Sequence, residues 1–179
     1  MVPLSQIPKA LKQAILAVED SRFYKHSGVD ILGILRALIA DIRAGSIVEG
    51  GSTITQQLTK ILFLTPEKTL SRKIKEAILA LLIESKYTKD ELLEIYCNQM
   101  YLGSGAYGVE AAAQTYFAKS VKDLNLNEAA LIGGLFRAPT RFSPFNNFAA
   151  AKKRMVRVLH RMVEEEYISP EEAAEASES

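Results

Sequence analysis

Apolar residues recur three and four positions apart along most of the chain, which is the spacing of one face of a helix. A first helix is expected to begin at Pro8, to carry Leu11, Ile15 and Val18 on one face, and to end near Phe23. No segment shows sustained alternation of apolar and polar residues, so a large sheet is not expected. The pattern predicts an all-α protein.

Capping signals place the other helices. We expect them over residues 31 to about 43, from 52, from 65 to about 86, from 89 to about 98, and from about 126 and 170. Their N-terminal signals are Asp30, Ser52, Thr65-Pro66, and the capping-box pairs Thr88 with Glu91, Asn125 with Glu128, and Ser169 with Glu172. Gly45 should end the second helix. Residues 171–179 are expected to form a polar tail.

The helix over residues 31–40 is apolar almost all round and is interrupted by Arg36. Such a helix is either fully buried or lies in a membrane interface. For a domain of this size burial in the core is the default interpretation. The interface interpretation becomes the stronger one only if the substrate is a lipid.

Length and charge narrow the classes of function. A chain of 179 residues is expected to form one domain, or one domain with two lobes. The net charge of +1 excludes recruitment of nucleic acid by the overall charge. Cys97 is the single cysteine, so an internal disulfide is excluded, and its apolar neighbours favour burial. The longest apolar run is too short to span a bilayer.

Residues 50–60 are the most informative segment. Two glycines precede a run of hydroxyl and amide side chains that ends at Lys60. A helix that begins at Ser52 would present free backbone N–H groups beside a cation, which suits a polar, anionic ligand. The alternative is a solvated amphipathic helix, and composition alone favours that alternative.

Two carboxylates are candidates for acid–base chemistry. Glu19 comes at the end of an apolar helix, where partial desolvation would suit a general base. Glu76 follows Arg72 by one helical turn, so an ordinary salt bridge is the simpler interpretation. Glu19 could equally be a solvated acid at a helix end, and His26 a loop histidine with a structural hydrogen bond. The spacing of His26 and His160 gives little support to a metal site.

The motifs occur in a fixed order along the chain. They are Glu19-Asp20-x-x-Phe23-x-x-His26-x-Gly28, the glycine-rich segment 50–60, Arg72-Lys73-x-x-Glu76, Asn98-Gln99-Met100-Tyr101-Leu102-Gly103-Ser104-Gly105-Ala106-Tyr107-Gly108, and Leu135-x-x-Ala138-Pro139-x-x-x-x-Pro144. Together they closely resemble the peptidoglycan glycosyltransferase domain of penicillin-binding proteins and monofunctional transglycosylases. The resemblance extends from about residue 7 to about residue 168.

The resemblance implies a lysozyme-like, two-lobed helical fold. Residues 29–62 would form a small membrane-facing lobe, and the remainder a larger globular lobe. The substrates would be lipid II and a lipid-linked growing glycan strand, at the extracytoplasmic face of the bacterial cytoplasmic membrane. The resemblance implies no organic cofactor. It is compatible with a divalent cation, Mg²⁺ or Mn²⁺, bound near Glu76. Other cell-wall synthesis proteins would be natural partners.

The resemblance also assigns roles to residues. Glu19 would be the general base, and Glu76 would orient cations rather than protonate the leaving group. The cations expected to stabilise pyrophosphate are Lys60, Arg72 and Lys73. The other expected substrate-binding residues are Asp20, Phe23, His26, Ser52, Thr53, Gln57, Asn98, Tyr101, Gly103 and Gly105.

Two positions depart from the family pattern. Ile61 stands where many relatives carry asparagine after the lysine, and Ser143 stands where asparagine is frequent. The competing hypotheses are a lysozyme-like enzyme that cleaves glycan, an inactive membrane-binding module and a purely structural helical domain. The cations around Lys60 and Arg72 argue against the first, because breaking a sugar–sugar bond involves no pyrophosphate.

Overall fold

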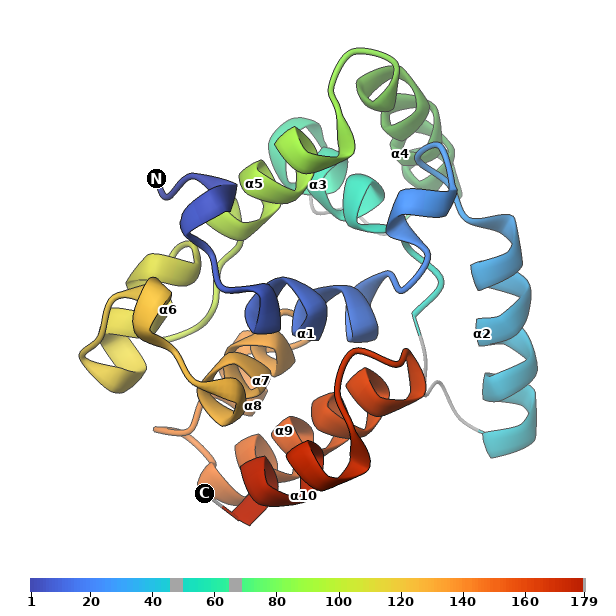
Figure 1. The fold of residues 1–179 in the computed structure, drawn as a ribbon. Helices are drawn as coiled ribbons and strands as arrows, with labels where there is room; N and C mark the ends of the chain where they lie inside the picture. Colours follow the sequence, from blue (N-terminus) through green and yellow to red (C-terminus); the bar gives the residue numbers. More distant parts are fainter. Residues whose placement is uncertain (46–49, 65–68, 179) are drawn as a thin grey trace. The chain divides into compact units, whose positions relative to one another are not determined.

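The computed structural model describes residues 1–45, 50–64 and 69–178, and these residues form helices joined by short connections (Figure 1). The described part of the chain contains no β-strand, only an isolated bridge between Tyr101 and Tyr107. The α-helices are α1 (Lys9–Glu19), α2 (Ile31–Ala44), α3 (Ile54–Phe63), α4 (Leu70–Glu84), α5 (Lys89–Gln99), α6 (Val109–Phe117), α7 (Leu126–Leu135), α8 (Pro139–Phe142), α9 (Phe148–Glu164) and α10 (Pro170–Glu178). Short 3₁₀ turns are η1 (Leu4–Gln6), η2 (Phe23–Lys25) and η3 (Val121–Asp123). The all-α prediction is confirmed.

The chain divides into two compact units. The first unit comprises Met1–Ser21 with Glu94–Ser179, and the second comprises Arg22–Leu93. The small lobe expected over residues 29–62 lies within the second unit and stays a prediction, and in this unit α3 packs against α4. The Thr55 hydroxyl of α3 donates a 2.6 Å hydrogen bond to the Glu84 carboxylate of α4, which ties the two helices together.

The core of the first unit is built from α1, α7 and α9, which pack against one another (Figure 1). Leu11 and Ile15 of α1 and Val158 of α9 are fully buried. Gly133 of α7 permits the closest approach, since a Cβ atom there would lie 3.0 Å from the Cβ of Ala14. The apolar face predicted for the first helix is therefore the face that packs.

The C-terminal residues form the helix predicted from the Ser169 and Glu172 pair, in a segment that was also expected to be a polar tail. Ser169 and Glu172 make the predicted capping box, with reciprocal hydrogen bonds of 2.7 and 3.1 Å. Ala173 and Ala176 of α10 are buried in the core cluster that α9 contributes to. The tail prediction was wrong because two small apolar residues, three positions apart, suffice to bury one face of a short polar helix.

Three helix starts or ends differ from the sequence prediction. α1 ends at Glu19, four residues early, because Asp20 has an extended backbone (φ −164°). α3 is capped by Thr53 rather than Ser52, in a capping box with Gln56. α4 begins at Leu70 with Thr69 as its cap, while the expected start at Thr65-Pro66 lies outside the described residues. The predicted capping pairs before α5 and α7 are confirmed.

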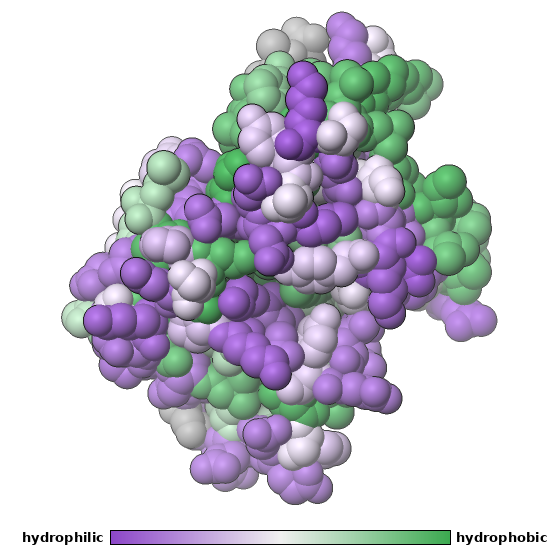
Figure 2. Space-filling view, turned by 45° about the horizontal axis from the view of Figure 1, so that its top comes forward, coloured by the Kyte–Doolittle hydropathy of each residue, from purple (hydrophilic) through white to green (hydrophobic). Residues whose placement is uncertain are grey.

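Helix α2 exposes most of its apolar side chains, so the default prediction of burial in the core was wrong. The exposed residues, between 41% and 71% accessible, are Ile31, Leu32, Ile34, Leu35, Leu38, Ile39 and Ile42. Among the apolar residues of this helix whose side chains the structure describes, only Ala37 is buried. Figure 2 shows the resulting hydrophobic surface over α2 at the right of the view. Gly45 ends the helix in the left-handed conformation, as predicted.

Candidate active site

Glu19 is the last residue of α1, in the first unit. Its side chain is 9% exposed, so it is not the solvated helix-end acid of the simpler interpretation. The guanidinium of Arg154 on α9 lies close to this carboxylate, with its Nη2 4.0 Å from the Glu19 Oε1. Burial disfavours the charged form of a carboxylate and so raises its proton affinity, which suits a general base.

The other predicted site residues of the first unit fall into two groups. Asp20, the residue after α1, is buried. The side-chain amide of Asn98 binds the N-terminal backbone: it accepts a 2.7 Å hydrogen bond from the Val2 N–H and donates a 2.9 Å hydrogen bond to the Val2 carbonyl. Asn98 is thereby given a structural role. Tyr101 and Gly105 are exposed and remain available to a ligand.

Gly103 is required by its surroundings. It has φ +89°, and a Cβ atom there would lie 2.7 Å from the Tyr116 hydroxyl and 2.9 Å from the Pro139 carbonyl. Ser143, which departs from the family pattern, is fully buried near the hydroxyls of Ser104 and Tyr116, at 3.3 and 3.5 Å. This hydroxyl cluster fixes the loop that carries Gly103.

In the second unit, Lys73 joins two other predicted residues. Its ammonium forms an ion pair with the Glu76 carboxylate and donates a 2.8 Å hydrogen bond to the Ser52 hydroxyl. The Glu76 side chain is 3% exposed, whereas that of Lys73 is 46% exposed. The partner of Glu76 is therefore Lys73, three residues away, and not Arg72 as the helical spacing suggested.

Two further cations of this unit are less constrained. Lys60 is exposed near the end of α3. Arg72 is half-buried in α4, and its Nε atom is buried with no hydrogen-bond partner among the described residues. A buried donor without a partner is uncommon in folded proteins, and a bound anion would satisfy it.

Thr53 and Phe23 are buried and make contacts within the protein, so they are not exposed to a ligand. The Thr53 hydroxyl donates a 2.6 Å hydrogen bond to the Gly28 carbonyl and accepts one from the Gln56 N–H. Phe23 is buried, and the Lys89 ammonium lies 4.4 Å from the centre of its ring. The half-buried His26 meets Phe23 edge-on at 6.2 Å, while Gln57, also half-buried, lies on α3.

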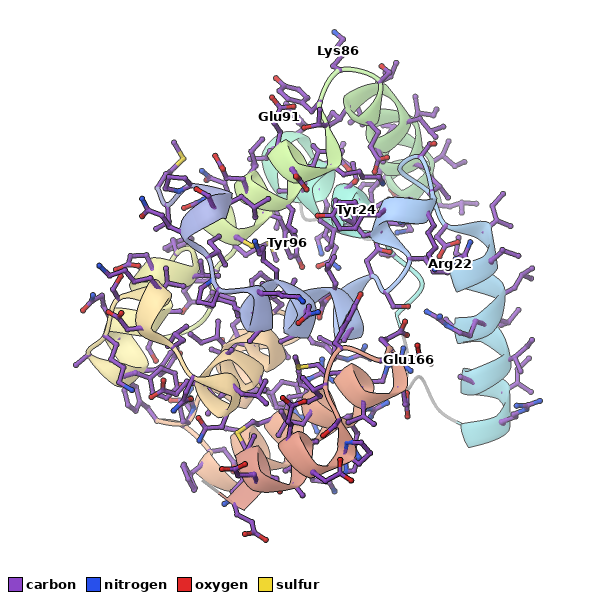
Figure 3. All side chains as sticks on the ribbon, in the orientation of Figure 1. Arg22, Tyr24, Lys86, Glu91, Tyr96 and Glu166 are labelled. Carbon is purple, nitrogen blue, oxygen red and sulfur yellow. The ribbon has the colours of Figure 1, made fainter. Side chains whose placement is uncertain are left out.

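Two polar contacts within the second unit hold the loop that carries Phe23, and they are made by Arg22 and Tyr24, both labelled in Figure 3. Arg22 pairs with Asp30 at 3.1 Å, and the Tyr24 hydroxyl donates to the Asp90 carboxylate at 2.7 Å. Asp30 is the N-cap residue of α2, but its side chain binds Arg22 and makes no capping hydrogen bond to the helix. The loop is consequently fixed by polar contacts that the motif pattern did not indicate.

Sequence reasoning missed Arg154 as a member of the site. Arg154 stands among the basic residues Lys152, Lys153 and Arg157 of α9, yet it is buried. The signal that could have found it is helical spacing, because Arg154 falls in register with Ala151, Met155 and Val158 on the apolar face of α9.

The residues around Glu76 do not form a metal site by themselves. Among the described residues, no group of three or more histidine, cysteine, aspartate or glutamate side chains could hold a metal ion. Glu76 brings one carboxylate, and that carboxylate is paired with Lys73. One paired carboxylate does not make a divalent-cation site without further oxygen ligands, which a bound phosphate could supply.

Comparison with known proteins identifies the class. The chain matches the transglycosylase family model over residues 1–163, and it belongs to this family. The resemblance indicated by the sequence motifs is therefore confirmed. Within the described part of the chain, no helix combines the length and apolar character needed to cross a membrane.

Individual relatives are similar over nearly the whole chain. Penicillin-binding protein 1A of Aquifex aeolicus is 54% identical over 98% of this chain and 24% of that protein. Penicillin-binding protein 1A of Escherichia coli is 52% identical over 96% of this chain and 20% of that protein. The crystal structure of penicillin-binding protein 1A from Haemophilus influenzae has a TM-score of 0.61 and 29% identity, and the match covers 99% of this chain and 17% of that one. The chain thus spans at most about a quarter of the length of these relatives.

Proposed function

We propose that this chain polymerises lipid II into β-1,4-linked glycan strands and releases undecaprenyl pyrophosphate. The observation that carries the proposal is the cationic group on α4. Lys73 is fixed by Glu76 and Ser52, and the neighbouring Arg72 has a buried Nε atom with no hydrogen-bond partner among the described residues. Cations arranged in this way suit a phosphate group whose negative charge increases during the reaction.

The reaction is a single displacement. Glu19 accepts the proton of the acceptor's GlcNAc 4-hydroxyl as that oxygen forms a bond to the anomeric carbon of the donor's MurNAc. The bond between the anomeric carbon and the pyrophosphate oxygen breaks, and the pyrophosphate leaves with the electron pair. An α-linked donor thereby gives a β-linkage, and no covalent glycosyl-enzyme is formed. The burial of the Glu19 side chain supports its role as the base.

The leaving group takes its stabilisation from Lys73 and Arg72, with Lys60 further along α3. Glu76 is nearly buried and accepts from Lys73, which supports a role in orienting the ammonium rather than in proton donation. Ser52 is the second acceptor for Lys73. When pyrophosphate binds, the Lys73 ammonium can redirect hydrogen bonds to the phosphate oxygens, since it carries three donors.

The roles proposed for the remaining predicted binding residues follow from how exposed each side chain is. Gln57, Tyr101 and Gly105 are accessible enough to contact sugar or phosphate oxygens. Thr53 and Phe23, both buried, are proposed to shape the site through the loop and helix that they hold. Mg²⁺ or Mn²⁺ near Glu76 stays a prediction, and no step of the proposed reaction depends on a metal.

The exposed apolar surface supports a membrane-bound substrate. Seven large aliphatic side chains of α2 are exposed, and Ile61, Leu62 and Phe63 at the end of α3 in the same unit are exposed as well. An exposed apolar area of this extent indicates an interaction site. We infer that these residues enter the membrane interface from which lipid II is taken. The location would be the extracytoplasmic face of the cytoplasmic membrane, with lipid II, the lipid-linked glycan and other cell-wall synthesis proteins as partners.

Two substrates separate the proposal from a glycan-cleaving enzyme. Incubation with purified lipid II in detergent is expected to give long glycan, which gel electrophoresis resolves by length. Incubation with purified sacculi is expected to release no soluble fragments. Fragments from sacculi without polymer from lipid II would replace the proposed function by hydrolysis. Binding to liposomes without either product would favour the inactive membrane-binding module.

A further inference from the structure

Arg154 is nearly buried on α9, and its guanidinium has three neighbours in the first unit. The Nε atom donates a 3.3 Å hydrogen bond to the Gly134 carbonyl of α7. The guanidinium carbon lies 5.7 Å from the centre of the Phe142 ring. Nη2 lies 4.0 Å from the Glu19 Oε1 and has no hydrogen-bond partner among the described residues. A buried arginine held by a carbonyl and a ring has few orientations open to it.

The path of the Arg154 side chain depends on glycine at position 134. A Cβ atom on Gly134 would lie 2.9 Å from the Arg154 Cγ, which is closer than side-chain carbons approach. The adjacent Gly133 permits the close approach of Ala14 of α1, because a Cβ atom on Gly133 would lie 3.0 Å from the Ala14 Cβ. The two glycines therefore bring α9 and α1 close to α7, and they bring Arg154 beside the end of α1 where Glu19 lies.

We propose that Arg154 is a positioning residue for Glu19, holding this carboxylate ionised and correctly oriented to accept the acceptor's proton. This inference rests on the proposed function. At 4.0 Å the contact is a charge interaction beyond hydrogen-bond length. It favours the ionised carboxylate without the bidentate hydrogen bonds that would weaken it as a base.

The charged groups around this pair keep Arg154 cationic while Glu19 titrates. Burial lowers the pKa of Arg154 to about 10, Glu19 raises it, and Arg137 and Arg157 lower it. Tyr96 of α5 stays neutral, because burial first and then the charges of Glu19, Cys97 and Asp20 hold its pKa well above the ordinary value. Asp20 is the other carboxyl group beside Glu19, so a titration must be assigned to one of these two residues.

The test compares Arg154→Met, which removes the charge at similar length, with Arg154→Lys, which keeps a charge but loses the planar group. Lys153→Met, an exposed cation of the same helix, is the control. The Glu19 carboxyl is followed by ¹³C NMR over pH and assigned with Glu19→Gln. The decrease of kcat toward acid pH (its acid limb) is measured in parallel, with lipid II as the substrate. NMR needs no activity, so it tests the pairing even if the wild-type chain makes no polymer and the proposed function fails.

We expect Arg154→Met to move the Glu19 titration midpoint up by about one pH unit, because an adjacent opposite charge lowers such a midpoint by about one to three units. The acid limb of kcat should move with it. Arg154→Lys should lower kcat about tenfold or more with little change in KM. Lys153→Met should change neither quantity. A wild-type midpoint in folded Arg154→Met would overturn the inference.

Two further variants keep the inference falsifiable if Arg154→Met does not fold. Arg154→Lys with wild-type kcat and wild-type midpoint would overturn it. Gly134→Ala leaves both charges present but pushes the Arg154 side chain from its path, so we expect it to raise the midpoint and lower kcat as well. Wild-type values for folded Gly134→Ala would show that the orientation of Arg154 has no effect on Glu19.

Discussion

Lys73 forms an ion pair with Glu76, and the two residues differ sharply in exposure: the carboxylate is almost wholly buried in α4, while the ammonium is about half exposed. A buried carboxylate with an accessible cation is suited to hold that cation in place while it binds an anion from solvent.

Lys73→Met should abolish most of the glycosyltransferase activity and also reduce stability. The substitution leaves Glu76 as a buried charge without its partner, and we expect a loss of about 1–2 kcal/mol in the free energy of unfolding, since Lys73 is only half-buried. Urea denaturation measures the stability, and lipid II polymerisation measures the activity.

The double variant Lys73→Met/Glu76→Gln separates the two effects. Removing the buried charge should restore stability to near the wild-type value without restoring activity. Lys75→Met, an exposed cation of the same helix, should be near wild type in both. Wild-type polymerisation by Lys73→Met would remove Lys73 from the leaving-group role.

Thr53→Ala should destabilise the second unit by about 1–3 kcal/mol. The substitution removes the N-cap of α3 and leaves the Gly28 carbonyl without the Thr53 donor. Thr53→Ser keeps the hydroxyl and should cost less. Equal unfolding midpoints for Thr53→Ala and Thr53→Ser would show that these hydrogen bonds contribute little.

Leu35→Glu should weaken liposome binding on the order of tenfold, because about one leucine side chain of apolar burial is lost. The side chain is 51% exposed, so the melting temperature should hardly change. Ala37→Glu on the buried side of α2 should instead lower the melting temperature. If Leu35→Glu melted early and still bound liposomes, α2 would be a core helix after all.

Cys97 should be unreactive in the native protein. It is fully buried, and burial raises the pKa of its thiol to about 12. Labelling by a disulfide reagent at pH 8 should be at least about 10³-fold slower than in urea, because thiolate is scarce and inaccessible. Rapid labelling under native conditions would contradict the burial.

The same pKa shift predicts how stability depends on pH. The thiol ionises near pH 8.5 in the unfolded chain and near 12 in the folded one. Its contribution to stability is therefore complete below about pH 8 and is lost as the pH rises toward 12. Cys97→Ala should remove this part of the alkaline loss in a urea titration series.

Local signals in the sequence predicted most helix starts, because capping depends on neighbouring residues. Ser169 with Glu172 predicted α10, yet the same polar residues also suggested a tail, and only burial of Ala173 against α9 decides between them. The exposure of α2 could not be read from its composition, because an apolar helix is compatible with either a core or a membrane.

The candidate site was less predictable than the fold. Motif order identified Glu19, Lys73 and Glu76, whose contacts fit chemical roles. It did not distinguish residues that meet a ligand from residues that hold the site, such as Thr53. It also passed over Arg154: helical spacing could have indicated that this residue is buried, but its pairing with Glu19 depends on the tertiary packing of α9, α7 and α1.

The central claim is that Glu19 is the base of a lipid II polymerase, and polymerisation by the wild-type chain and its Glu19→Gln variant tests it most directly. We expect long glycan from the wild type and a loss of on the order of 10² to 10⁴ in turnover for folded Glu19→Gln, as removal of a general base produces. Glycan formed by Glu19→Gln at the wild-type rate and length would contradict the account.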